Sequence, residues 1–422
     1  MLKRKPLAGH AWWLLGISGI FSISVGLSNT FVNVYLWKVD HRYTSIGWYN
    51  FAIYCMIPLT FLVAGWLAKR WHSVATLRMG IVLHGLFYLI ALLGGTAAGR
   101  LPVLLGVMMG LAAGFYWCSF NALSLQFTAL GTRDWFYSLN GVMGAIAGVV
   151  APPVAGWLIS AEDRWGGLSG YHWIFTLSLI LFGCAALCTL KLHANARRGQ
   201  LKMWSALQSL ARRPWRMILF GCLIYGLREG VFLFLIGLLM YIATGSELKL
   251  GEFFLLQGVL SFASFFIVGR LVKPPTRLRY LGAGAICMAA TALLFLLPIS
   301  ARLLMVYGAV ISLVLPMFLV PLQGFVFDTI SQLPDATTYR MEYIILREIF
   351  ENIGRVTGIG VFIGLMTMSP TALAISRFAA ALGFVQLFTW MLIAVGQRRV
   401  GRTPSGPAGK PLLQRATARV GR

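Results

Sequence analysis

Charged side chains are scarce in this sequence, and acidic ones most of all. Asp, Glu, Lys and Arg make up only 11% of the 422 residues and only 12 residues are acidic, whereas 58% are hydrophobic and the mean hydropathy is +0.77. Soluble domains carry roughly 25% charged residues. The composition therefore excludes a water-soluble enzyme or binding module.

Motifs that carry enzyme chemistry are missing as well. The chain has no HExxH motif and no Gly-rich phosphate loop. Its six cysteines form no CxxC pair and have no histidine at metal-ligand spacing; all lie in apolar stretches, at Cys55, Cys118, Cys184, Cys188, Cys222 and Cys287. We expect no enzyme activity, no cofactor, no metal and no disulfide framework.

Long apolar runs dominate what is present. A helix needs about 20 apolar residues to cross the hydrocarbon core of a bilayer. The chain offers twelve such segments, beginning near Ala11, Ile46, Met79, Pro102, Ser138, His172, Pro214, Gly251, Tyr280, Leu303, Tyr343 and Thr371. The pattern predicts an all-α membrane protein with twelve transmembrane helices, the first of them uncleaved.

Basic residues give the chain a formal net charge of +24. Most Lys and Arg residues fall in alternate connections, on the side that the N-terminus shares. By the positive-inside rule, we expect both termini to lie in the cytoplasm. The membrane is expected to be the plasma membrane. The basic connections are expected to contact anionic lipid headgroups, and nucleic acid is not an expected partner.

Two stretches suggest an internal repeat. "GLSNTFVNVY" begins at Gly26 and "GLREGVFLFL" at Gly226, and 45–69 overlays 249–273, with both copies ending in Gly-x-Leu-x-Lys. We predict two six-helix bundles, residues 1–191 and 214–397, related by a parallel pseudo-twofold repeat. A basic cytoplasmic linker (192–213) would join them, and a basic disordered tail (398–422) would follow. A monomer is expected.

The segment "GWLAKRWHSVATL" resembles a motif of a known protein family. Together with the six-plus-six duplication, it resembles the helix 2 to 3 motif of the major facilitator superfamily through Gly65, Leu67, Ala68, Arg70 and Leu77. Lys69 stands where the family has an Asp that helps to latch the two halves in the outward-facing state. The sign of that charge is thus inverted, and the second copy repeats the change with Gly269 and Lys273.

A second motif, "GAIAGVVAPPVAGW", resembles one found mainly in exporters of that superfamily. Gly144, Gly148, Pro153 and Gly156 match it, whereas Pro152 and Trp157 replace the usual glycines. The resemblance implies the superfamily fold and secondary transport by rocking of two bundles, and it favours export. Small residues at this spacing allow close helix packing, but they are common in membrane helices, so the direction of transport stays open.

Six charged residues fall where hydrocarbon is expected. Arg228 and Glu229 interrupt the apolar stretch 217–242, and a second group lies in 343–368, at Arg347, Glu348, Glu351 and Arg355. Unpaired charges are costly in a bilayer. In the superfamily fold the two segments would be neighbours, so we expect Glu229 to contact Arg347 or Arg355, and Arg228 to contact Glu351.

Two interpretations of these six residues remain open. In one, Glu229 or Glu351 takes up and releases a proton, and an arginine vacated by its carboxylate binds an anionic solute. In the other, the balanced charges only hold two helices together. Candidate solute contacts in the first half are Asn29, Asn33, Tyr116, Trp117, Asn121 and Asn140, with helix packing as the alternative role. His84 is expected to be structural.

These observations favour one function over two others. We expect a secondary transporter that couples export of a small organic solute to protons. Uptake of an organic anion is the alternative that the intramembrane arginines favour, and a membrane sensor that does not transport is the third possibility.

Overall fold

The computed structural model describes residues 7, 9–128, 130–162, 169–193, 201–336 and 338–397, and all regular structure in these ranges is helical. Residues 194–200 of the predicted linker and the predicted tail, 398–422, lie outside the described ranges.

Twelve of the described helices are long and apolar enough to cross a membrane. They are α1 (Gly9–Asp40), α2 (Tyr43–Arg70), α3 (Ser73–Gly99), α4 (Pro102–Phe127), α5 (Leu130–Glu162), α6 (Ser169–Cys188), α8 (Arg213–Thr244), α9 (Glu247–Leu271), α10 (Arg277–Ala292), α11 (Ala301–Ser331), α12 (Arg340–Met368) and α13 (Ala372–Gln397). Short 3₁₀ turns at both ends of α10 extend its span to Pro274–Leu296. The predicted twelve-helix fold is confirmed. The start of α5 differs most from expectation, and a short helix, α7 (Met203–Gln208), precedes α8.

Several helix ends are capped by polar or glycine residues just outside the apolar runs. Ser246 accepts a hydrogen bond from the Lys249 amide at the start of α9, and Ser300 does the same for Leu303 at the start of α11. Gly245 ends α8 in the left-handed conformation that glycine tolerates best. These caps satisfy backbone groups that have no partner within the helix.

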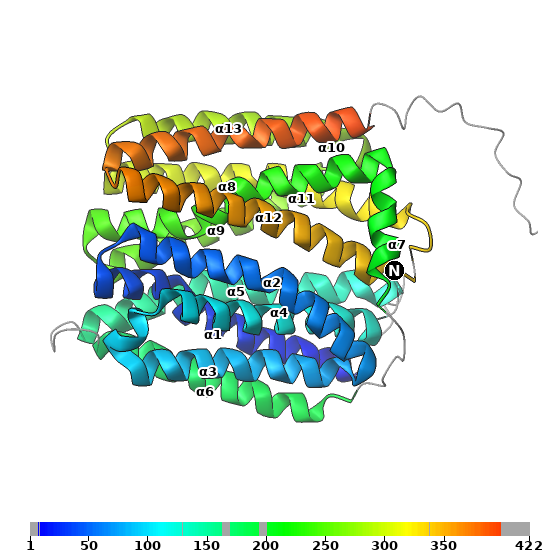
Figure 1. The fold of residues 1–422 in the computed structure, drawn as a ribbon, viewed down its shortest axis with the longest axis horizontal. Helices are drawn as coiled ribbons and strands as arrows, with labels where there is room; N and C mark the ends of the chain where they lie inside the picture. The colour runs from blue at the N-terminus through cyan, green and yellow to red at the C-terminus, as the bar shows by residue number, and fades with distance from the viewer. Residues whose placement is uncertain are drawn as a thin grey trace, which may run out of the picture.

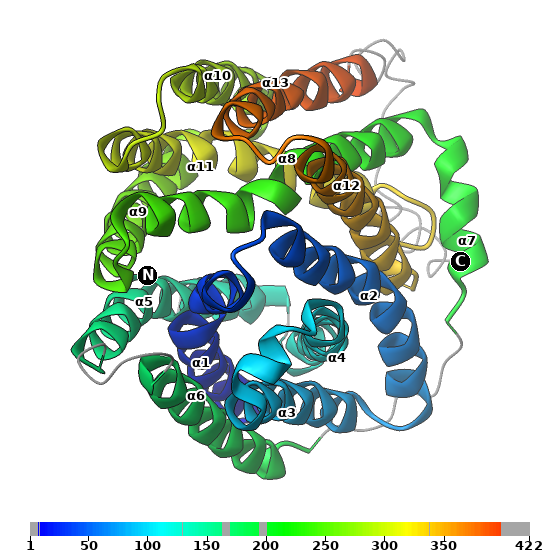
Figure 2. The same ribbon diagram turned by 60° about the vertical axis from the view of Figure 1, so that its left-hand side comes forward.

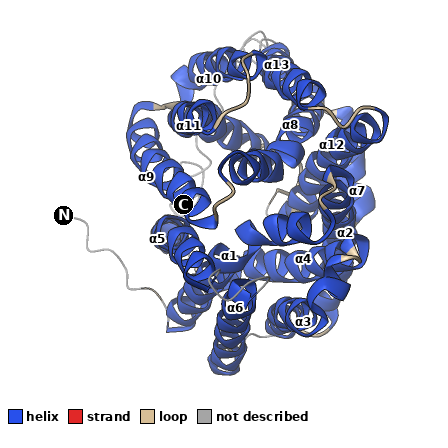
Figure 3. Cartoon of the chain, turned by 90° about the vertical axis from the view of Figure 1, so that its left-hand side faces the viewer, coloured by secondary structure: helices blue, strands red, loops and turns tan. Residues whose placement is uncertain are grey.

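The helices form two groups, α1–α6 and α8–α13, which occupy the lower and upper parts of Figure 1 and remain separate in Figure 3. Within the first group α2 and α3 pack on α4, and α1 packs on α5 and α6; within the second, α8 packs on α12 and α13. The groups meet mainly where α2 faces α12 and where α5 faces α9. Figure 2 shows α7 beside the α2 and α12 ends.

Glycines bring α8 and α12 into close contact. A Cβ atom on Gly354 would overlap the carbonyl oxygen of Leu223, and one on Gly358 would overlap that of Leu227. On the facing helix, a Cβ on Gly226 would overlap the carbonyl oxygen of Glu351. The two backbones can approach this closely only because these positions have no side chain.

Gly156 and the two prolines of α5 pack closely on α9 of the other half. A Cβ on Gly156 would lie 2.5 Å from the carbonyl oxygen of Glu247, and Gly251 packs on the Pro152–Pro153 backbone. Both contacts join α5 to α9 of the other half. A Cβ on Gly144 or Gly148 would meet nothing within 4 Å, although the Gly148 carbonyl oxygen lies 3.4 Å from the position of a Cβ on Gly258 of α9.

Candidate functional site

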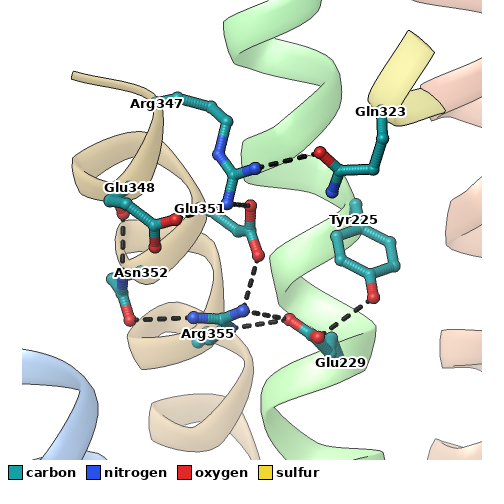
Figure 4. A network of polar contacts seen from close by, with 8 residues as sticks. All are labelled: Tyr225, Glu229, Gln323, Arg347, Glu348, Glu351, Asn352 and Arg355. Atoms are coloured by element: carbon teal, nitrogen blue, oxygen red, sulfur yellow. Dashed lines mark hydrogen bonds and ion pairs between the residues drawn. The ribbon is translucent and has the colours of Figure 1, made fainter. Parts of the chain in front are cut away.

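Five charged side chains meet between α8 and α12, and we call them the charge cluster: Glu229, Arg347, Glu348, Glu351 and Arg355 (Figure 4). The guanidinium of Arg355 lies 2.6 Å from the Glu229 carboxylate and 2.5 Å from that of Glu351. Arg347 lies 3.0 Å from Glu351 and also pairs with Glu348. Glu229 is the only member on α8, so its ion pair with Arg355 ties the two helices together.

Neutral side chains add hydrogen bonds to the charge cluster, although the buried Nε of Arg347 has no partner among the described residues. The Tyr225 hydroxyl donates to Glu229 at 3.0 Å, and Arg347 donates to the Gln323 side chain on α11 at 3.2 Å. Arg355 donates to the side chain of Asn352 at 3.2 Å. Charged groups in a low-dielectric site need such partners to offset the water they lose.

One contact joins the charge cluster to the first half of the chain. The Arg355 guanidinium lies 5.2 Å from the ring centre of Tyr54 on α2, within the range of a cation–π interaction. Tyr54 had no distinguishing signal in the sequence, because an aromatic residue in an apolar helix usually packs.

Part of the predicted pairing is present and part is wrong. Glu229 contacts Arg355, as expected. Arg228 does not pair with Glu351: its Nη2 donates to the Tyr307 hydroxyl on α11 at 2.9 Å. Residues 228 and 229 point about 100° apart on a helix, so when Glu229 faces α12 its neighbour must face elsewhere.

The first-half candidates are spread over several helices. Trp117 is 43% exposed and Asn29 is also exposed, whereas Tyr116 is buried and stacked on Phe21. Asn33 accepts a hydrogen bond from Asn50 at 2.9 Å.

Asn140 on α5 accepts a hydrogen bond from Ser18 on α1 at 2.6 Å. Asn121 is half-buried, and its backbone carbonyl oxygen accepts from the Ser124 hydroxyl on the same helix, α4. His84 is buried with Nδ1 2.8 Å from the Gly80 carbonyl oxygen, in agreement with its predicted structural role.

A lysine of the first half meets a glutamate of the second near each end of the helices. Lys38, near the end of α1, lies 2.5 Å from Glu247 at the start of α9, and the Tyr171 hydroxyl also donates to Glu247. Lys69, near the end of α2, lies 2.9 Å from Glu342 at the start of α12. Because α1 and α2 run in opposite directions, the two bridges lie at opposite ends.

The Lys69–Glu342 bridge shows what Lys69 contacts at the position where the motif has an Asp. Glu342 is 1% exposed, and the same oxygen accepts from the Lys202 amide at 3.2 Å. The first half thus supplies the positive charge of this contact. Gly65 packs near Ile345, and Arg70 lies 5.3 Å from the Trp66 ring. In the second copy, Lys273 is exposed and a Cβ on Gly269 would meet nothing within 4 Å.

Exchanging the charges of Lys69 and Glu342 tests this bridge. We expect Lys69→Glu to lower the free energy of unfolding by about 1–3 kcal/mol, because it places a carboxylate beside a buried one. The double variant Lys69→Glu/Glu342→Lys should recover at least half of the loss, measured by titrating SDS into mixed micelles. Lys273→Glu, at the exposed repeat position, is the control. A double variant no more stable than Lys69→Glu would contradict the pairing.

A sequence model of the Major Facilitator Superfamily matches residues 14–340. This chain belongs to that superfamily. It is 38% identical over 373 residues to the uncharacterized protein YqgE of Bacillus subtilis (strain 168), which covers 88% of this chain and 86% of the relative. An uncharacterized protein in the sodM 3′ region of Geobacillus stearothermophilus is 39% identical over 188 residues, 44% of this chain and 86% of the relative.

Solved structures of superfamily transporters share the fold. A D-xylose–proton symporter superposes with a TM-score of 0.71 and 12% identity, covering 92% of this chain and 99% of the symporter. The nucleoside transporter NupG gives a TM-score of 0.69 at 12% identity, with 92% and 99% covered. The chain is therefore a multi-pass membrane protein and a secondary transporter of a solute. Its family and its fold are those of transporters.

Proposed function

We propose that this transporter couples the movement of a small organic solute to protons through the charge cluster. One observation carries the proposal: three carboxylates share two guanidinium groups, since Arg347 contacts Glu348 and Glu351, and Arg355 contacts Glu351 and Glu229. Such a set holds one excess negative charge, and a single proton neutralises it. Buried sites of this kind exchange protons when their surroundings change.

Glu229 is the proposed proton acceptor. Its side chain is 20% exposed, whereas that of Glu351 is 6% exposed, so a proton reaches Glu229 more readily. A protonated Glu229 loses its ion pair with Arg355, which keeps Glu351 as its partner. Proton uptake would thus weaken the tie between α8 and α12 beside the Tyr54 contact with the first half, and so bias the rocking of the two halves.

We further propose export, with both termini in the cytoplasm and the protein in the plasma membrane. The α5 motif supports export, and the distribution of Lys and Arg supports the orientation. The proposed moving bodies are residues 1–191 and 214–397, joined by 192–213, in a monomer whose basic connections contact anionic lipids. The exposed Trp117 and Asn29 are the proposed solute contacts in the first half.

Uptake of an organic anion is the second candidate. It is favoured by Arg228, which is 5% exposed and has no carboxylate partner among the described residues. In that case the same cluster would couple protons to inward movement of the solute.

Replacing Glu229 with Gln tests the proposed coupling. Gln keeps the side-chain shape but cannot exchange a proton, so we expect solute movement driven by a pH gradient to fall at least about tenfold, or ~1.4 kcal/mol in barrier height. The readout is internal pyranine fluorescence in proteoliposomes exposed to nucleosides, xylose and small carboxylic acids. Glu252→Gln, in the exposed Lys249–Glu252 pair, is the control. Wild-type flux that ignores the pH gradient would refute proton coupling.

A further inference from the structure

Arg228 is one of the six charged residues that the sequence places in the membrane, and it is not a member of the charge cluster. All three glutamates of that set are engaged with Arg347 and Arg355. No carboxylate in the described part of the chain forms an ion pair with Arg228. A guanidinium keeps its charge at any physiological pH, so this charge is not removed by loss of a proton.

The surroundings of Arg228 are aromatic. Its guanidinium lies 4.3 Å from the ring centre of Phe232, and its Nη2 donates to the Tyr307 hydroxyl at 2.9 Å. The Tyr307 ring lies 4.6 Å from that of Phe295. The hydroxyl and the ring faces stabilise a cation only in part, since neither carries a full negative charge.

Two buried hydrogen-bond donors at this place have no acceptor in the described part of the chain. Arg228 is 5% exposed, and its Nε–H has no partner there. Tyr307 is a 2% exposed residue whose hydroxyl accepts the Arg228 bond, and no acceptor for the hydroxyl proton is present among the described residues. Burying a charge with an unmet donor costs several kcal/mol. An anion with two oxygen atoms would provide an acceptor for both donors.

We propose that Arg228 and Tyr307 bind the carboxylate of a transported organic acid. One carboxylate oxygen would accept from Nε–H of Arg228 and the other from the hydroxyl of Tyr307, while Phe232 and Phe295 contact an apolar body. The inference rests on the proposed transport function and names its solute class: a small monocarboxylate with an apolar or aromatic remainder. It requires no proton at this site, because the guanidinium is already charged.

The proposal is tested by comparing the binding of benzoate with that of its neutral analogue benzamide. The full-length protein is purified in detergent at pH 7. We expect benzoate to raise the melting temperature and to bind by calorimetry, and benzamide to do neither. Arg228→Met should weaken benzoate binding at least about tenfold, Arg228→Lys should restore only part of it, and Tyr307→Phe should weaken it severalfold. Arg270→Met, which removes an exposed arginine 4.0 Å from the Phe266 ring, is the matched control.

Three results would overturn the proposal: no preference of the wild type for benzoate over benzamide, unchanged binding in Arg228→Met, or equal stabilisation by chloride and inorganic phosphate, which would assign the site to a resident inorganic anion. If Arg228→Met does not fold, the benzoate comparison and Tyr307→Phe still decide. This binding assay uses no gradient. Its failure is therefore distinct from a failure of proton coupling, which Glu229→Gln tests.

Discussion

Replacing Arg355 with Met is expected to lower the free energy of unfolding by about 3–5 kcal/mol, because it leaves the half-buried carboxylate of Glu229 without a cation beside the buried carboxylate of Glu351, which keeps only Arg347. Arg355 lies 2.6 Å from the first and 2.5 Å from the second, so no other residue of the charge cluster can take its place for Glu229. Titration of SDS into mixed micelles measures the loss.

Two further variants separate the lost charge from the lost shape. Arg355→Lys should recover only part of the stability, since an ammonium cannot span two carboxylates as the planar fork does. Adding Glu229→Met to Arg355→Met should recover stability, because it removes the carboxylate that has lost its cation. If Arg355→Met unfolds at the same SDS fraction as the wild type, the ion pairs described here do not stabilise the protein.

A single methyl group on Gly354 is expected to separate α8 from α12. The added Cβ would overlap the carbonyl oxygen of Leu223, and backbone cannot move aside as a side chain does. We expect Gly354→Ala to cost about 1–3 kcal/mol or more. Under the proposed proton coupling it should also abolish transport driven by a pH gradient, because Glu229 and Arg355 bond across this contact. Stability and pyranine-reported flux are measured on the same preparation.

Gly364 provides the matched control on the same helix. A Cβ there would meet nothing within 4 Å, so Gly364→Ala should be neutral or stabilising by up to about 1 kcal/mol through helix propensity. Equal behaviour of the two alanine variants would show that the close approach of α8 and α12 does not matter.

The fold was predictable because the bilayer imposes it. Apolar runs of about 20 residues can only be helices in hydrocarbon, and the duplicated stretches at Gly26 and Gly226 indicate two bundles. The start of α5 was less predictable, since residues 130–138 are polar enough to resemble a connection. Hydropathy locates the apolar part of a helix, and the helix itself can continue into polar residues outside the bilayer.

The site was predictable only where local geometry determines it. Arg347, Glu351 and Arg355 recur every four residues, so they share a helix face and pair along α12. Arg228 was misplaced because both it and Glu229 were directed to α12, although a helix cannot point adjacent residues the same way. Lys38–Glu247 and Lys69–Glu342 join segments far apart in the chain, and a single sequence carries no signal for such pairs.

The two bridges between the halves bear on leakage. Glu247 and Glu342 are each 1% exposed, lie at opposite ends of the helices and take their lysine from the other half. A conformation open at both ends would strand two buried carboxylates at once, a cost that the energies of single bridges suggest is several kcal/mol. A continuous water-filled pore is thereby disfavoured, so the two bridges limit leakage of ions and solutes through the carrier.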